Sequence, residues 1–360
     1  MGQIIAEIVA DSISPQGDRL ISVLATFPRI ILSEMNTHRM LSKNTSSSRA
    51  IPFNKMVEAV QNNPFIPIAW QKHHSGMQGI EYFTDEKDIY RVEQVWRDAR
   101  RRAIDVAKDL HSSKVTKQLC NRLLEPFMWT TMLITGSKEG WENFHSLRCP
   151  DYVFHDENKE YHFKSKKDVI QKFGESEWVE GEYNKPLKDL TDIDWLKLNK
   201  GQAEIHIMDL AEKIYDVIQE STPKQSEKDQ WHIPFEDKIN ELYPGLTLED
   251  QIKVSVGMAA NTSYTVVGDG SIINLEKATR IHDKCKELNH SSVFEHCARS
   301  MSNEEYVSFI KGNLDAEIDA DGYIDISTHI NNHNSFGWCR NFKGFIPYRH
   351  IIETKKYGDI

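Results

Sequence analysis

The feature that most constrains the fold of this 360-residue chain is a long amphipathic segment at residues 85–112. Its apolar side chains recur three or four positions apart, at Ile89, Val92, Val95, Trp96, Ala99, Ala103 and Val106. This spacing places them on one face of a helix with about 3.6 residues per turn. We therefore expect one long helix here, and at least part of the fold must be helical.

Three other segments have the pattern of β-strands. Residues 3–13 and 18–27 alternate apolar and polar side chains, and the turn sequence SPQGD separates them. Residues 127–135, FMWTTMLIT, are aromatic and β-branched, as is typical of a buried strand. Strands and helices in one chain predict a mixed α+β fold.

Further helices are expected along the whole chain, because helical periodicity returns after each loop. Pro28 is expected to open a helix through residue 38, and Pro126 is expected to stop another. The remaining predicted helices are 53–63, 138–148, 201–220, 247–260, 273–288 and 292–299. Residues 319–322, DADG, predict a turn between strands, and residues 220–230 predict a polar linker.

Composition excludes some classes of protein. The net charge of −10 argues against general nucleic-acid binding. No apolar run is long enough for a membrane span, and the N-terminus lacks the basic region of a signal peptide. The five cysteines are odd in number and form no C-x-x-C pair, which favours reduced thiols. We therefore expect a cytoplasmic protein, without membrane or nucleic-acid partners.

The stretch NTHRMLSKNTSSSRAIP, residues 36–52, stands out against this acidic background. It combines His38, Arg39, Lys43 and Arg49 with six hydroxyl residues and contains no acidic residue. Hydroxyls, backbone N–H groups and arginines suit the oxygens of a phosphate. Composition alone leaves a solvated loop and an anion-binding cradle evenly balanced.

A second polar cluster is NHSSVFEHCA, residues 289–298. Ser291 or Ser292 could cap a helix whose first turn holds Glu295, but capping does not explain His290 and His296. Those two histidines with Glu295 would be metal ligands, yet their spacing is not H-E-x-x-H. We therefore expect no metal site.

Arginines in two other segments allow more than one interpretation. Arg148 ends the helix that carries Asn143, where it complements the helix dipole, and it precedes Cys149, whose thiol it could activate. Arg122 lies on an otherwise apolar helix and needs an acceptor, either Glu125 or a ligand. Common nucleotide-binding and hydrolase motifs, such as G-x-G-x-x-G and G-x-S-x-G, are absent from the sequence.

Together these segments resemble the flavin-dependent thymidylate synthases, the ThyX family. The signature of that family is R-H-R, seven residues and Ser; here Thr37-His38-Arg39, seven residues and Ser47 match it except at the first position. NHSSVFEH resembles the H-x-S-x-x-E-H element of the family. NRLLEP, NFHSLR and QAEI are similar to three further family segments.

The resemblance implies a ThyX-like fold, with a central sheet flanked by long helices, a rearranged element order and an insertion. The H-x-S-x-x-E-H element follows the signature here, whereas it precedes it in the usual family, as if the chain were a circularly permuted, viral-type member. One half would be residues 1–148 with the helix at 201–220, and residues 149–200 would be the insertion. Residues 221–246 would be a linker, and residues 247–360 the half that contacts FAD.

The resemblance also implies roles for individual residues. Arg148 would be catalytic, facing the pyrimidine ring and favouring its N3-deprotonated form. The residues implied to bind FAD are His38, Arg39, Asn143, His290, Ser292 and Glu295. The residues implied to bind the nucleotide are Ser47, Ser48, Arg49, Arg122 and Arg148. Thr37 and Thr45 depart from the family, which has an arginine and an acidic residue there.

The implied activity is one-carbon transfer from 5,10-methylenetetrahydrofolate to C5 of a deoxypyrimidine monophosphate, most simply dUMP to dTMP, with NADPH reducing FAD. The family also implies a homotetramer. Two alternatives stay open: hydroxymethylation of dUMP or dCMP for modified phage DNA, and a non-catalytic protein that binds flavin or nucleotide. Thr37, in place of the arginine, keeps both alternatives open.

Overall fold

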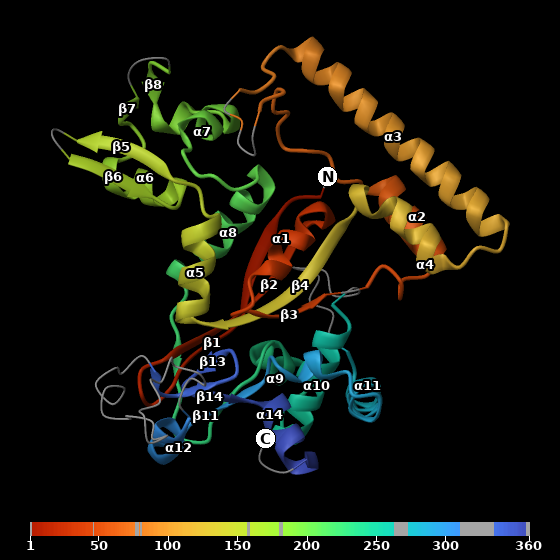
Figure 1. Cartoon of the computed structure of the whole chain (residues 1–360). Coiled ribbons are helices and arrows are strands. Elements are labelled where there is room, and N and C mark those ends of the chain that lie inside the picture. The colour runs from red at the N-terminus through yellow and green to blue at the C-terminus, as the bar shows by residue number, and fades with distance from the viewer. Residues whose placement is uncertain are drawn as a thin grey trace, which may run out of the picture.

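The computed structural model describes residues 2–45, 47–75, 79, 81–156, 159–179, 183–262, 273–309 and 335–357. These residues form a mixed α+β fold, as predicted. A five-stranded sheet, in the order β3-β4-β2-β1-β9, lies at its centre. Its strands are β1 (Ile5–Ile13), β2 (Arg19–Pro28), β3 (Ser42–Thr45), β4 (Trp129–Ser137) and β9 (Lys224–Gln225). Figure 1 shows β1, β2 and β4 crossing the middle of the molecule.

Strand β2 organises the sheet because it pairs along its length on both sides. It is antiparallel to β1 and to β4, and its register with β4 is unbroken from Leu20↔Ser137 to Pro28↔Trp129. Residues 20–25 are at most 1% exposed. A strand covered on both faces needs a nearly continuous apolar run, which LISVLA provides. The three predicted strands are therefore confirmed to within two residues.

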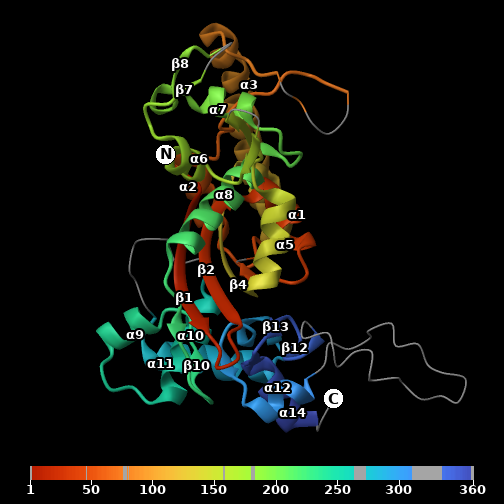
Figure 2. The same cartoon turned by 90° about the vertical axis from the view of Figure 1, so that its left-hand side faces the viewer.

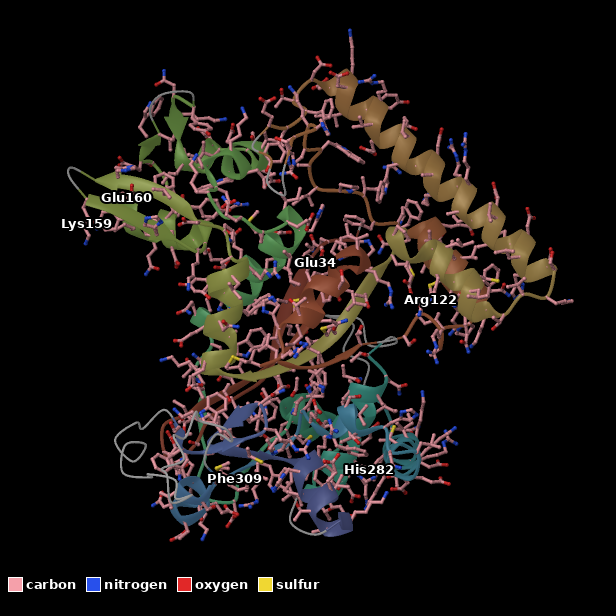
Figure 3. The ribbon with its side chains drawn as sticks, viewed as in Figure 1. Glu34, Arg122, Lys159, Glu160, His282 and Phe309 are labelled. Carbon is pink, nitrogen blue, oxygen red and sulfur yellow. The ribbon has the colours of Figure 1, made fainter. Side chains whose placement is uncertain are left out.

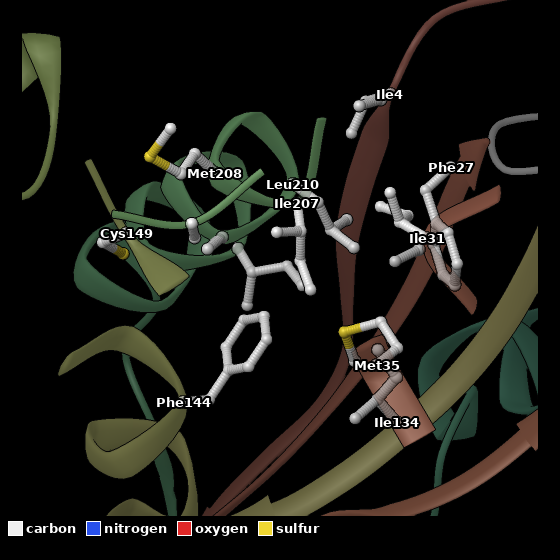
Figure 4. Packing of buried hydrophobic residues seen from close by; sticks show 14 of the residues in the cluster. Ile4, Phe27, Ile31, Met35, Ile134, Phe144, Cys149, Ile207, Met208 and Leu210 are labelled. Atoms are coloured by element: carbon white, nitrogen blue, oxygen red, sulfur yellow. The ribbon is translucent and has the colours of Figure 1, made fainter. Parts of the chain in front are cut away.

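One face of the sheet is covered by helices from the first 220 residues. They are α1 (Leu32–Thr37), α5 (Lys138–Arg148) and α8 (Ile205–Glu220), and the last two confirm predicted helices. In Figure 4, Met35 of α1 lies close to Ile134 of β4, and Phe144 of α5 lies beside Ile207 of α8. This packing fixes the C-terminal end of α5 and the end of α1 relative to the same strands.

The other face packs against the C-terminal part of the chain. Leu24 and Leu133 point to this side because side chains alternate along a strand. The helices here are α9 (Glu236–Leu242), α10 (Leu248–Ala260), α11 (Leu275–Glu287), α12 (Asn303–Ser308) and α14 (Tyr348–Tyr357). The short strands are β10 (Trp231–His232), β11 (Ala298–Ser300), β12 (Trp338–Cys339), β13 (Phe342–Lys343) and β14 (Phe345–Pro347). Figure 2 shows these elements gathered at one end of the long strands.

The predicted long helix is confirmed as α3 (Glu86–Ser112). It packs on α2 (Phe53–Asn62), α4 (Lys117–Cys120) and the 3-10 helix η2 (Asn121–Phe127) through a separate apolar cluster. Only Ile104 and Ala107 of α3 are fully buried, and Val95 is 66% exposed. The amphipathic pattern is therefore real, but part of its apolar face is uncovered.

The segment predicted to be an insertion contains its own small core. It is built from β5 (Tyr152–Asp156), β6 (Lys159–Phe163), α6 (Lys166–Phe173), β7 (Trp178–Val179), β8 (Lys185–Pro186), η3 (Leu187–Asp189) and α7 (Asp192–Leu198). Tyr152, Val169, Leu187 and Trp195 form the buried centre of this cluster. The following segment, expected as a polar linker, supplies strand β9, which pairs in parallel with β1.

Two local predictions were wrong and a third was right in part. Pro126 does not stop a helix, because it lies inside η2. The helical segment expected after Pro28 begins at Arg29, as the short η1 (Arg29–Ile31) followed by α1, but Pro28 is its N-cap and the last residue of β2, not its first helical residue. The helix expected at 292–299 is instead the 3-10 turn η4 (Ser291–Phe294) followed by β11. Part of the stretch at 36–52 is strand β3, because its backbone completes the edge of the sheet beside β4.

The predicted turn at 319–322 lies outside the described residues. Among the residues that are described, no helix is long and apolar enough to cross a membrane.

Replacing Leu133 by Ala should lower the free energy of unfolding by about 2–5 kcal/mol, because it leaves a cavity between two packed layers. Leu133 is 0% exposed at the centre of β4. Leu147→Ala, at a position that is 58% exposed, is the matched control and should change stability by less than about 1 kcal/mol. Urea unfolding followed by circular dichroism measures both, and equal losses would contradict this placement of the core.

Candidate functional site

Strand β3 connects the two segments that the sequence singled out. Its side chains alternate between the two faces of the sheet. Lys43 donates a hydrogen bond to the backbone carbonyl of His38, at the end of α1. Asn44 donates to the carbonyl of Ala259, and its side-chain oxygen accepts a hydrogen bond from Ser292 Oγ at 3.1 Å. Residues 248 positions apart in the sequence therefore meet at this edge strand.

On the α1 side of β3, Arg148 and His38 form a close pair. Arg148 is the last residue of α5, and its Nε donates to His38 Nε2 at 2.9 Å. Its Nη2 lies 3.5 Å from Thr37 Oγ1. The His38 ring also packs edge-on against Phe144, with 4.9 Å between ring centroids. The guanidinium is thus held by a neutral imidazole and a hydroxyl, and neither partner cancels its charge.

Burial and nearby cations shift the titration of this group of residues. The pKa of His38 is lowered from 6.5 to about 4, first by burial and then by Arg148 and Lys43. Burial also lowers the pKa of Lys43 to about 8, against an opposing effect of Glu295. At neutral pH, His38 is therefore an uncharged acceptor beside two cations, an arrangement that favours an anionic ligand.

On the other side of β3, the turn at residues 290–296 contains three of the predicted cofactor-binding residues, His290, Ser292 and Glu295. Ser292 is exposed and contacts Asn44, as described above. Glu295 forms an ion pair with Arg349 of α14, which also contacts Glu353 at 2.8 Å. Arg349 was not among the predicted site residues, because its contact with Glu295 joins positions that are 54 residues apart in the sequence.

The three residues of this turn that were considered as metal ligands point in different directions. His290 is exposed, Glu295 faces Arg349, and His296 is fully buried with its Nδ1 2.9 Å from Thr135 Oγ1. Among the residues that the structure describes, no group of three or more His, Cys, Asp or Glu residues is placed to hold a metal ion.

The predicted phosphate-binding residues follow β3 directly. Ser47 and Arg49 are exposed, whereas Ser48 is buried, so its hydroxyl is less accessible than predicted. The backbone N–H of Arg49 lies 3.3 Å from Ser47 Oγ, and Asn121 holds the turn by donating to the carbonyls of Ser48 and Ile51. Asn121 therefore holds the backbone of the turn, while Ser47 and Arg49 stay exposed to solvent.

Arg122 lies in η2, away from β3, and is labelled in Figure 3. The side chain of Arg122 is 57% exposed, so it depends less on an acceptor than its place on an apolar helix predicted. Its Nη1 lies 3.8 Å from Glu125, the acceptor considered from the sequence. The buried cation at Glu125 is instead Arg29, at 3.3 Å, and these three residues line a hollow of about 510 Å³ with Asn36.

Two further predicted residues, Arg39 and Asn143, are exposed. In the sequence, Arg39 follows His38 directly and Asn143 precedes Arg148 on α5. Cys149 is buried, and burial raises the pKa of its thiol well above the usual range. A buried thiol that stays protonated is a poor nucleophile, so the structure disfavours the thiol interpretation of Arg148-Cys149.

Comparison with known proteins identifies no family for this chain. No protein-family model and no curated protein sequence matches it. Solved structures that match include two of the UMP/dUMP methylase PolB from Streptomyces cacaoi, bound with 5-Br UMP and with 5-Br dUMP. Their identities are 16% and 14%, each with a TM-score of 0.34, over 41% of this chain and 78% and 79% of those chains. At this TM-score the similarity assigns neither a family nor an activity.

The Arg148–His38 contact should be visible in the titration of His38. NMR of the imidazole should give a midpoint near pH 4, well below the ordinary value of 6.5. Arg148→Ala should raise the midpoint, because it removes a cation and admits water. Arg122→Ala, which removes an exposed arginine elsewhere, should leave it unchanged.

The same shift has a consequence for stability. Because the pKa is lowered in the folded state, the unfolded chain binds the proton more readily between pH 6.5 and about 4. The stability that neutral His38 contributes is thus complete above pH 6.5 and is lost as the pH falls toward 4. A His38 midpoint near 6.5 in the wild-type protein would contradict the described site.

Proposed function

We propose that this protein is a flavin-dependent enzyme that transfers a one-carbon unit from 5,10-methylenetetrahydrofolate to C5 of a deoxypyrimidine monophosphate, most simply dUMP. The observation that carries the proposal is the meeting of two motif-bearing segments at β3. Each resembles a different element of the flavin-dependent thymidylate synthases, and the Asn44–Ser292 hydrogen bond joins them across 248 positions. Two unrelated matches would have no reason to lie together.

The Arg148 guanidinium is the group that we propose acts on the pyrimidine. C5 of uracil is a poor nucleophile, and a cation beside O2 and N3 increases the electron density at C5 by stabilising anionic ring character. His38 occupies Nε and Thr37 lies beside Nη2, so the guanidinium is fixed while it retains N–H donors for a ligand. A pre-oriented cation costs little reorganisation during the reaction.

The residues around β3 suit an anionic cofactor such as FAD. Arg39 and Lys43 supply positive charge, and Ser292 supplies a hydroxyl. We propose that FAD is bound by His38, Arg39, Asn143, His290, Ser292 and Glu295. Reduced by NADPH, the flavin would supply the hydride that completes the transferred group. Glu295 is already paired with Arg349, so its role would be to hold the turn and that arginine in place.

We propose that the nucleotide phosphate binds at the turn after β3. Ser47 and Arg49 are exposed there, and Ser48, whose side chain is buried, would contribute through its backbone N–H. Arg122 would contact the nucleotide from the hollow that it shares with Asn36. The family resemblance also supports a homotetramer as the working assembly.

Hydroxymethylation of dUMP or dCMP is the second candidate, and Thr37 favours it. Thr37 is exposed, and its hydroxyl donates to the Glu34 carbonyl at 2.7 Å. A short side chain here leaves room beside Arg148 that an arginine would fill. A different base or a larger transferred group would need such extra space beside the pyrimidine.

Mass spectrometry of the products tests the proposal directly. The purified protein would be incubated with dUMP or dCMP, 5,10-methylenetetrahydrofolate, FAD and NADPH. A product that has gained CH2, because a methyl group has replaced the C5 hydrogen, supports thymidylate synthesis. A product that has gained CH2O, because a hydroxymethyl group has replaced that hydrogen, supports the second candidate. A protein that takes up no FAD and leaves both nucleotides unchanged would refute both.

Arg148→Ala should abolish turnover, a loss of about 100-fold or more, while FAD remains bound, because the cation at the pyrimidine is removed. Steady-state product formation and flavin fluorescence measure the two effects separately. Cys149→Ala is the neighbouring control and should keep most of the activity, since the thiol is buried and protonated. Unchanged turnover in Arg148→Ala would remove Arg148 from the mechanism.

A further inference from the structure

A chain of hydrogen bonds between buried polar side chains runs beneath the candidate site. Ser12 Oγ lies 2.9 Å from His232 Nδ1, and His232 Nε2 lies 2.8 Å from Ser22 Oγ. Ser22 Oγ lies 2.6 Å from Thr135 Oγ1, which lies 2.9 Å from His296 Nδ1. All five residues are at most 6% exposed. This relay links strands β1, β2 and β4 to the residue that follows Glu295.

The order of protons along this relay is restricted. Burial lowers the pKa of His232 and of His296 to about 3, so both imidazoles are neutral at physiological pH. A neutral imidazole has one donor and one acceptor, and each hydroxyl has a single proton to donate. A hydroxyl can accept two hydrogen bonds, but among the described residues Ser22 and Thr135 have no side-chain partner outside the relay. Every hydrogen bond is then made, and no hydroxyl proton is left over, only if all of them point in the same direction along the relay. The tautomers of the two histidines are therefore coupled.

The free end of the relay is Nε2 of His296. This atom is buried and has no hydrogen-bond partner among the described residues. Buried polar groups are rarely left unpaired, so such an atom calls for a specific explanation. Depending on the direction of the relay, Nε2 presents either a proton or a lone pair.

The relay is attached to β3 as well as to the turn at residues 290–296. Thr135 pairs with Ser42 in the β3–β4 ladder, so their side chains share one face of the sheet. Asn44 lies two positions further along, on the same face, and contacts Ser292. One residue of β4, Thr135, therefore holds His296 through its side chain and β3 through its pairing.

We propose that His296 is a positioning residue, held by the relay, which places the turn at 290–296 against β3 and so sets the Ser292–Asn44 contact of the candidate site. Its importance for a cofactor rests on the proposed function, but its effect on the turn does not. His296 acts through Ser292 and Glu295, and it does so only while its ring is fixed by Thr135.

Thr135→Val tests the proposal, because it removes the linking hydroxyl and nearly preserves the shape of the side chain. Thr26→Val is the matched control: Thr26 Oγ1 lies 2.9 Å from Thr131 Oγ1 on the same two strands, outside the relay. Hydrogen exchange of peptides spanning 290–296 should accelerate about tenfold in Thr135→Val and stay near wild type in Thr26→Val. Thr135→Ser, which restores a hydroxyl, should recover slow exchange.

Imidazole ¹⁵N NMR gives a readout that loss of stability alone would not change. The wild-type protein should show one tautomer at each of His232 and His296, and Thr135→Val should change the tautomer of His296. Ser22→Ala breaks the relay one step further away and should have the same effect, which covers the case in which Thr135→Val does not fold. FAD affinity should fall about tenfold in both variants and stay unchanged in Thr26→Val.

The possible outcomes separate the two proposals. A wild-type protein that binds no FAD refutes the proposed function, and exchange and NMR then decide the positioning role alone. Thr135→Val and Ser22→Ala proteins that match Thr26→Val in exchange and in His296 tautomer would overturn the positioning role, whatever binds at the site.

Discussion

The pairing of β3 with β4 is the interaction on which the rest of the structure depends. β3 spans only Ser42–Thr45, yet its pairing with β4 fixes which side chains point to each face of the sheet. One face receives Lys43 and the end of α1, and the other receives Asn44 and the turn at residues 290–296. A one-residue slip of β3 would exchange the two faces and separate both groups. The site therefore depends on strand register more than on any single contact.

Charge around β3 is arranged in a way that the acidic composition hides. The chain has a net charge of −10, but Lys43, Arg148 and Arg349 cluster near this edge of the sheet. Glu295 is paired with Arg349, and it opposes the lowering of the pKa of Lys43 by burial. The neutral His38 adds an acceptor for Arg148 without adding charge. A local cationic site in an acidic protein suits a small anionic ligand.

Much of the fold follows from sequence periodicity, and the site follows only in part. The long helix and the three long strands were predicted closely. Burial of one face, or of both faces, gives each of them a regular pattern of apolar residues in the sequence. β3 was missed because its four residues are polar, and only pairing with β4 makes them a strand. His296 was wrongly predicted to lie in a helix. Its contact with Thr135 joins positions 161 residues apart, so the local sequence carries no sign of it. Arg349 had no local signal, since its partner Glu295 is distant in sequence.

The central claim is that β3 joins the two segments into one flavin-binding site. A double-mutant cycle with Asn44→Ala and Ser292→Ala, read as FAD affinity by flavin fluorescence, tests it most directly. If the two side chains act as one unit, the double variant should lose less FAD-binding free energy than the two single variants lose together. The coupling free energy should be about 0.5–1.5 kcal/mol. Strictly additive losses, or no FAD binding by the wild-type protein, would contradict the account.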